Sequence, residues 1–425
     1  MYPKSVLFKF LTVYCISGFL ILGLDVTELR TELLIRTEAI KIALEKNPEV
    51  TAARKDWEIA RARLTQARAL PDPELELEYE ELPGVSDIKR YGERNLGISQ
   101  RVEFPVKWWL RNRAASRSAD AVRMAVFETT KLEVATRVKI TYDRVLMEQK
   151  VLEYTEKNLQ LAQDLLHKAN VRFEAGDVPQ LEVLRAEVET GRAENRVTMA
   201  RNGLSVSRAE LNTLLAREIH TPLEVTDDFS YLPIEADLEK LIDLALEHRP
   251  DLLGAGLKVA AAHSNQSAAV SSIMPDLNIG VFRQRIRGDV DNGNFWHVVL
   301  GIDVPIWAMF RQRGEIAEAS AETARAAAEE NALRYQVLLE VKSAFLDLKS
   351  TEDQVQLFQN RILREAKRAH EVASMSYQEG KASYLELLEA QRALTETRVE
   401  YAQALFNHRS ALAALERAVG GNLPE

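Results

Sequence analysis

Cysteine is almost absent from this chain of 425 residues: Cys15 is the only one, so no disulfide can form within one copy. Aromatic residues make up only 7%, and alanine, leucine, glutamate and arginine dominate the middle of the chain. This composition favours long helices packed on helices over a broad sheet. With 46% hydrophobic and 28% charged residues, the chain is too polar for a bundle of membrane helices and too apolar for a disordered protein.

The sequence also lacks the motifs of catalysis. Its seven histidines are scattered without metal-ligand spacing, and it has no Cys-x-x-Cys, phosphate-binding glycine loop or nucleophile motif. We therefore expect no enzymatic activity, no cofactor and no metal site. His297 is interpreted as a lumen or rim residue rather than a ligand. A net charge of -9 argues against nucleic acid as a partner.

The first 24 residues differ from the rest. Lys4 and Lys9 precede an uncharged apolar run over residues 10–24, and Asp25 follows at once. This order predicts an export signal over residues 1–24, with a retained membrane anchor as the alternative. Cys15 lies inside the apolar run, so it is interpreted as a leader residue, with lipidation as the alternative.

The remainder contains the same landmarks twice. "ALEKNPEV", "LPDPEL", "VEFP" and "FEAGDVPQLEVLRAE" are matched in the same order by "ALEHRPDL", "MPDLNI", "IDVP" and "YQEGKASYLELLEAQ". Each pair is separated by about 200 residues, far more than the period of a solenoid. The pattern predicts a duplicated unit, with this division of the chain: first repeat 25–217, linker 218–236, second repeat 237–418 and C-terminal tail 419–425.

Each unit has the same predicted elements. A helix, over about 37–69 or 237–272, leads to two strands, a very long helix free of internal proline, and a final helix. In the first repeat we expect strands at about 73–82 and 94–104, a long helix at about 107–175 and a helix at 179–217. In the second we expect strands at about 275–285 and 294–304, a long helix at about 310–379 and a helix at 382–418.

Apolar residues recur every seven positions along both long helices. They are Val138, Val145, Leu152, Leu159, Leu166 and Phe173 in the first, and Val341, Leu348, Val355, Ile362 and Ala369 in the second. Such heptads predict coiled-coil packing. A helix of some 70 residues is roughly 105 Å long. Two shorter helices stacked end to end along each long one would build the wall of a cylinder, although a rod-shaped scaffold satisfies the same lengths.

The strands alternate in polarity. In "PELELEYEEL", one face carries Glu74, Glu76, Glu78 and Glu80, and the other carries Leu75, Leu77 and Tyr79. This alternation is typical of a transmembrane barrel, and also of a half-buried soluble sheet. Four strands cannot enclose a polar lumen, whereas three copies would supply twelve. We therefore predict that the glutamates line a lumen and that lipid contacts Leu75, Leu77, Tyr79, Trp296, Val298 and Leu300.

Several stretches resemble the TolC-type outer-membrane efflux proteins. They are "EAIKIALEKNPEV", "ISQRVEFPVKWWLRNRA", "GIDVPIWAMFRQRGEIAEA" and "YQEGKASYLELLEAQRALTETRVEYAQAL". "LPDPELELEYEE" and residues 311–316 are more similar to the heavy-metal-efflux branch. The resemblance implies a mainly α fold with a small β part, in which a homotrimer forms a 12-stranded outer-membrane barrel that continues into a long periplasmic α-helical barrel.

The resemblance also implies a function and partners. The protein would be the exit duct of a tripartite pump, passively conducting metal cations or other small toxic solutes. It would dock a periplasmic adaptor and serve an inner-membrane RND-type transporter. Alternatives with the same fold are ducts for protein secretion or multidrug export. An exported coiled-coil scaffold is an alternative of a different class.

Two sets of site residues follow from the resemblance. The adaptor-docking tip maps to Gly176, Asp177, Gly380 and Lys381, although a glycine such as Gly380 is also an ordinary helix C-cap. An acidic tunnel aperture maps to Glu386 and Glu389, with Glu182 at the position that repeats Glu386. Its alternative is a solvated face of a surface helix.

Overall fold

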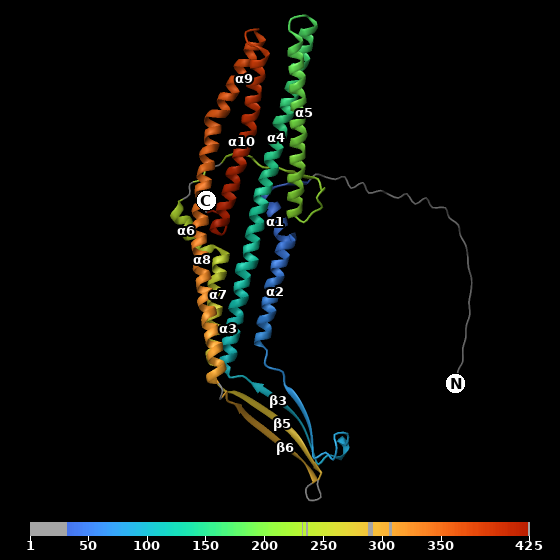
Figure 1. Ribbon diagram of the computed structural model, residues 1–425, viewed down its shortest axis with the longest axis vertical. Coiled ribbons are helices and arrows are strands. Elements are labelled where there is room, and N and C mark those ends of the chain that lie inside the picture. Colours follow the sequence, from blue (N-terminus) through green and yellow to red (C-terminus); the bar gives the residue numbers. More distant parts are fainter. Residues whose placement is uncertain (1–31, 232, 235–236, 288–291, 306–307, 424–425) are drawn as a thin grey trace, which may run out of the picture.

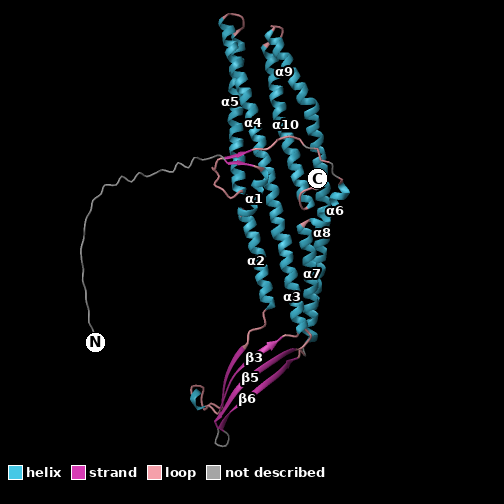
Figure 2. Ribbon diagram, turned by 180° about the vertical axis from the view of Figure 1, so that it is seen from behind, coloured by secondary structure: helices cyan, strands magenta, loops and turns pink. Residues whose placement is uncertain are grey.

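A computed structural model describes residues 32–231, 233–234, 237–287, 292–305 and 308–423. The predicted export signal and Cys15 lie outside the described residues. The molecule is elongated, with a sheet at one end and long helices running away from it (Figure 1). Two helical hairpins form the opposite end, and their turns are the points farthest from the sheet (Figures 1 and 2).

The first half of the chain runs from a short strand through the first hairpin. Its elements are β1 (Glu32–Leu34), α1 (Arg36–Lys46), α2 (Pro48–Arg68), β2 (Glu74–Glu80), the 3-10 turn η1 (Ile88–Arg90), β3 (Glu93–Val102), α3 (Pro105–Val122), the π-helical turn η2 (Arg123–Glu128), α4 (Thr129–Glu174), α5 (Gln180–Leu214) and β4 (Leu223–Val225).

The second half repeats this order without the flanking short strands among its described residues. Its elements are α6 (Leu238–His248), α7 (Pro250–Ser271), β5 (Asp276–Arg287), β6 (Asn292–Asp303), α8 (Ala308–Leu357), the π-helical turn η3 (Phe358–Ile362), α9 (Leu363–Gln378) and α10 (Tyr384–Val419). Gly420, with φ +91°, ends α10 in the left-handed conformation that glycine adopts without strain.

The four long strands form one antiparallel sheet in the order β2-β3-β5-β6. The central β3–β5 pair joins the two halves of the chain, and β2 and β6 are the edges. The register places Leu75 opposite Ile98, Ile98 opposite Val281, and Val281 opposite Val298. Because side chains alternate along each strand, this row puts apolar residues of all four strands on one face of the sheet.

In each half, the single helix predicted to precede the two strands is in fact a pair of helices. Residues 37–69 and 237–272 each form two helices, which separate at Asn47 and Arg249. A proline follows each break, and the ring of proline disfavours the helical conformation of the residue before it. Asn47 then caps α2, because its side chain accepts a hydrogen bond of 2.8 Å from the amide of Glu49.

The long helices are continuous but contain one π-helical turn each. The heptad positions nearest the middle, such as Val138 and Val341, are fully buried, while Phe173 is exposed. Nearer the tip the buried positions shift to Leu165 and Ala169. An α-helix drifts by about 20° per heptad relative to a strict seven-residue repeat, so one column of residues does not face its neighbour along the whole length.

A second, very small sheet had no signal in the sequence. β1 pairs in parallel with β4, which lies in the segment predicted as a linker. The hydroxyl of buried Tyr142 lies 2.8 Å from the carbonyl oxygen of Leu34 and 2.9 Å from that of Thr226. Burial raises the pKa of Tyr142 to about 12, so this hydroxyl stays a neutral partner for both segments.

Candidate channel wall

The polar face of the sheet carries the four glutamates of β2. Ser99 on β3 donates a hydrogen bond of 2.7 Å to Glu76, and Asn95 donates one of 3.3 Å to Glu80. The ring of His297 stacks on Phe282, with 5.1 Å between ring centroids. His297 therefore lies on this polar face, beside the strand that carries Phe282.

The opposite face is apolar and uncovered. Leu75 is 77% exposed, Trp296 is 71% exposed and Leu300 is 76% exposed. Val298 and Leu77 on the same face are also exposed, and Tyr79 is half-buried against Tyr91. Soluble proteins rarely leave a continuous apolar patch of this kind in water. The face therefore requires an apolar environment outside the chain.

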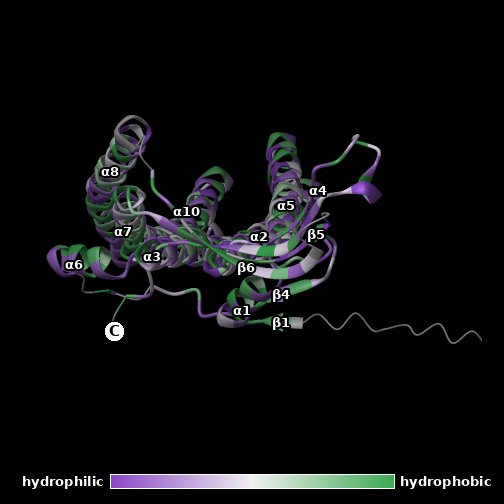
Figure 3. Cartoon of the chain, turned by 90° about the horizontal axis from the view of Figure 1, so that it is seen from below, coloured by the Kyte–Doolittle hydropathy of each residue, from purple (hydrophilic) through white to green (hydrophobic). Residues whose placement is uncertain are grey.

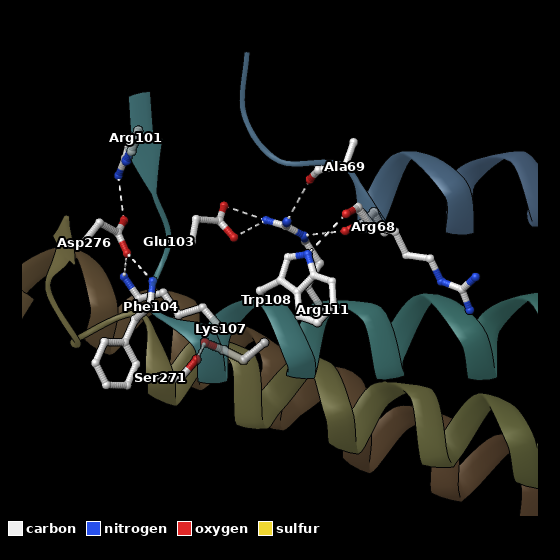
Figure 4. A network of polar contacts seen from close by, with 12 residues as sticks. Arg68, Ala69, Arg101, Glu103, Phe104, Lys107, Trp108, Arg111, Ser271 and Asp276 are labelled. Atoms are coloured by element: carbon white, nitrogen blue, oxygen red, sulfur yellow. Dashed lines mark hydrogen bonds and ion pairs between the residues drawn. The ribbon is translucent and has the colours of Figure 1, made fainter. Parts of the chain in front are cut away.

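A polar network fixes the sheet to the helices (Figure 4). Asp276, at the start of β5, is 6% exposed and accepts hydrogen bonds of 2.8 Å from Arg101 and 2.8 Å from Lys107. The same carboxylate also accepts a hydrogen bond of 3.3 Å from the backbone amide of Phe104. Since these donors lie on β3 and at the start of α3, one carboxylate holds the strand-to-helix turn of the first half against the second half.

Midway along the helices, another buried carboxylate joins the two halves. Asp143 on α4 is completely buried and forms ion pairs of 3.1 Å with Arg36 and 3.1 Å with Arg409 of α10. Arg409 also pairs with Asp227, beside β4, at 3.1 Å. Burial raises the pKa of Asp143, and this effect exceeds the lowering by the two arginines.

The residues predicted for the tip lie at the far ends of the hairpins. Gly176 has φ +79° and Gly380 has φ +73°. The next amides, of Asp177 and Lys381, donate to carbonyl oxygens five residues back, at 2.9 Å and 2.8 Å. This is the Schellman arrangement that ends a helix, so both glycines have a structural reason to be there.

The predicted aperture residues lie just inside the tip. Glu386 forms a capping box with Ser383, whose amide donates a hydrogen bond of 2.7 Å to the glutamate carboxylate. Glu386 and Glu389 are exposed on α10, and Glu182 is half-buried in the first turn of α5. One chain therefore does not gather the three carboxylates into a single buried cluster.

Sequence reasoning missed a buried glutamate further along the hairpins. Glu189 on α5 is 3% exposed and forms an ion pair with Arg392 on α10. Arg196 lies 3.6 Å from its other oxygen. Burial raises the pKa of nearby Tyr384 to about 12, with a further contribution from the charge of Glu189. Nothing in the sequence distinguishes Glu189 from the exposed glutamates around it.

Two features are absent from the described residues. No group of three or more histidine, cysteine, aspartate or glutamate side chains is arranged to hold a metal ion in that part of the chain. Within the same residues, no helix combines the length and the apolar character needed to cross a membrane.

The fold defines a class of duplicated proteins in which paired strands continue into long helical hairpins. The family model for the outer membrane efflux protein matches residues 39–217 and 241–421. The chain belongs to this family, whose members act in efflux across the outer membrane. It is an outer-membrane protein with a periplasmic helical portion.

Curated relatives cover most of the chain at low identity. The chain is 24% identical to the cobalt-zinc-cadmium resistance protein CzcC of Cupriavidus metallidurans, over 90% of this chain and 89% of that protein. It is also 24% identical to the pyoverdine export outer membrane protein OpmQ of Pseudomonas putida, over 77% of this chain and 70% of that one.

Solved structures show the same fold. The Campylobacter jejuni CmeC outer membrane channel superposes with a TM-score of 0.76 at 16% identity, covering 91% of this chain and 85% of that one. CusC superposes with a TM-score of 0.75 at 20% identity, covering 92% of this chain and 94% of CusC.

Proposed function

We propose that the protein is the outer-membrane exit duct of a tripartite efflux system, working as a homotrimer. In this proposal three four-stranded sheets join edge to edge, β6 of one copy to β2 of the next, into a twelve-stranded barrel. Closure gives every edge strand a partner, as the lipid interior demands of backbone polar groups. The protein would act as a passive conduit rather than as an enzyme, with no cofactor of its own.

One observation carries the proposal. The sheet has two free edges and one continuous, exposed apolar face, from Leu75 on β2 to Leu300 on β6. The apolar face meets lipid, and the opposite face, with the glutamates of β2, then lines a lumen. The other predicted lipid contacts are Leu77, Tyr79, Trp296 and Val298, and the lumen residues are Glu74, Glu76, Glu78 and Glu80.

We propose metal cations, or other small toxic solutes, as the substrates. Rows of carboxylates attract cations and exclude anions. The printed name of the CzcC relative, which refers to cobalt, zinc and cadmium resistance, supports this choice, while the OpmQ name refers to pyoverdine export. A strain lacking the gene should accumulate more of the exported ion, and unchanged metal accumulation and tolerance would rule out the metal assignment.

The partners are assigned to the far end of the molecule. The hairpin turns with Gly176, Asp177, Gly380 and Lys381 would dock a periplasmic adaptor, which connects to an inner-membrane RND-type transporter. The exposure of Asp177 and Lys381 at the end farthest from the sheet supports this position. Lys381 forms an ion pair of 2.7 Å with Glu379, so a charged pair is presented beside the turn.

Glu386 and Glu389 would form an acidic aperture inside the tip, with Glu182 of the neighbouring hairpin beside them. Replacing both Glu386 and Glu389 with glutamine should reduce cation selectivity, because it removes two negative charges per chain from the narrow part of the tunnel. Glutamine at position 386 still accepts the capping hydrogen bonds, so α10 keeps its start. The reversal potential of single channels in a planar bilayer under a salt gradient measures the effect.

A matched control is Glu239→Gln, an exposed glutamate on α6, which lies at the outer edge of the helices (Figure 3). It should leave the reversal potential unchanged. If the double variant keeps wild-type selectivity, these carboxylates are a solvated helix face and the aperture assignment is wrong.

A further inference from the structure

Four arginines lie on the apolar face of the sheet at the end away from the helices. They are Arg94 on β3 and Arg283, Arg285 and Arg287 on β5. The register places Arg94 directly opposite Arg285, and Arg283 beside Trp296. We call these four residues the arginine band.

The arginine band has no acidic partner. In the described part of the chain, no carboxylate forms an ion pair with any of its four members, and three of them are exposed. The basic residues at the opposite end of the sheet differ, since Arg101 and Lys107 both pair with Asp276. Like charges directly opposite each other on a sheet are unfavourable. An external anion between Arg94 and Arg285 would remove that repulsion.

Aromatic rings lie at the level of the arginine band: Trp296 is opposite Arg283, and Tyr79 is opposite Arg94. Arg94 and Arg287 lie over the ring of Tyr91, with guanidinium carbons 5.6 Å and 4.3 Å from its centroid. Arg283 lies 6.0 Å from the ring of Trp296. A girdle of aromatic residues marks the boundary between hydrocarbon and headgroups on a membrane barrel. The arginine band therefore lies at the level of the lipid headgroups.

The position of the helices identifies the membrane leaflet whose headgroups lie beside the arginine band. The helices occupy the periplasm and leave the sheet at the Asp276 end, so the arginine band lies at the outer surface. The outer leaflet presents lipid A, whose glucosamine headgroup carries phosphates. Arginine binds phosphate through paired N–H donors, and each guanidinium in the band keeps its donors free of carboxylates.

We propose that the arginine band is a binding site for the phosphates of lipid A, with Arg94 and Arg285 clamping one phosphate. The inference rests on the proposed barrel. The exposed apolar rows below the arginine band would contact the acyl chains of the same lipid. Lys89 and Arg90, exposed in the loop between β2 and β3, add positive charge beside it.

Equilibrium binding of fluorescent diphosphoryl lipid A to the full-length, detergent-purified protein tests this. Replacing both Arg94 and Arg285 with glutamine should weaken binding by about tenfold, since two charge-assisted phosphate contacts are lost. The double lysine variant should recover part of the affinity because it restores the charges. The matched control replaces Arg63 on α2 and Arg334 on α8, exposed arginines without ion pairs among the described residues, with glutamine.

Two comparisons identify the ligand. Wild-type protein should bind diphosphoryl lipid A more tightly than the monophosphoryl form, and the glutamine variant should lose this preference. Inorganic phosphate should not displace the lipid at equal concentration. Equal binding by wild type and variant, equal binding of the two lipid forms, or displacement by inorganic phosphate would each overturn the proposal.

The barrel itself is checked separately. The arginine band faces lipid rather than the lumen, so the glutamine variant should keep the single-channel conductance of the wild type. A wild-type protein that conducts but shows no phosphate preference refutes the lipid site alone. A wild-type protein that does not conduct refutes the barrel on which the site rests.

Discussion

At the scale of residues, a few buried charges hold the helices of the second half of the chain together. Arg249, at the α6–α7 break, is 5% exposed and pairs with Asp251 at 2.8 Å and with Glu340 of α8 at 2.7 Å. Its guanidinium also lies 3.4 Å from the carbonyl oxygen of Ala418. Breaking such a buried pair costs about 3–5 kcal/mol, because it leaves a charge without a partner.

Glu340 makes the stability of the helices depend on pH. Burial alone would raise the pKa of Glu340, but hydrogen bonds from Gln336 and Arg249 and the charges of Arg249 and Arg417 outweigh it, so the pKa is lowered from 4.5. A carboxylate with a lowered folded-state pKa stabilises the fold above its ordinary pKa and loses this contribution as the pH falls through the folded-state value. The thermal midpoint of wild type should therefore exceed that of Glu340→Gln at neutral pH.

The difference between these midpoints should shrink once the pH falls below 4.5, the ordinary pKa of the carboxyl. Circular dichroism of the detergent-purified proteins measures both midpoints. Glu329→Gln, an exposed glutamate on the same helix, serves as the control and should follow wild type throughout. A difference that stays constant with pH would mean that Glu340 contributes packing and no charge.

At the scale of elements, the hairpin turns depend on glycine for conformation rather than for space. A Cβ on Gly380 would meet nothing within 4 Å, but its φ of +73° is unfavourable for any residue with a side chain. Gly380→Ala should therefore destabilise the protein by about 1 kcal/mol. Chemical denaturation in detergent, followed by the helical circular dichroism signal, checks this value.

Gly191, inside α5, is the matched comparison. It also has open space around its Cβ position, but it lies in a regular helix. Gly191→Ala should stabilise by roughly 0.5–1 kcal/mol, because alanine is the better helix former. If both substitutions shift stability in the same direction, backbone strain does not control the turn.

Much of the element order was predictable from the sequence. Period-two alternation located the long strands, because one face of this sheet is apolar over the part next to the helices. The helix breaks were missed, since proline is also compatible with the first turn of a continuing segment. β1 and β4, of three residues each, are too short for any periodicity. The partners of Glu189 and Asp143 depend on tertiary contacts between helices far apart in sequence, which no local pattern reveals.

At the scale of the whole molecule, one chain is an open structure. Seen from the sheet end, the helices stand in a curved row above the sheet (Figure 3). The sheet has free edges and an exposed apolar face, and the hairpins extend away from it. These features are explained together if several copies close into a membrane barrel with a continuous helical tunnel. The trimer remains our proposal.

Single-channel recording of the detergent-purified wild-type protein in a planar lipid bilayer tests this account most directly. A trimeric duct should give discrete, cation-selective openings from a heat-modifiable oligomer. A protein that stays dissolved without detergent and gives no conductance would contradict it, because the apolar face of the sheet would then be covered by something other than lipid.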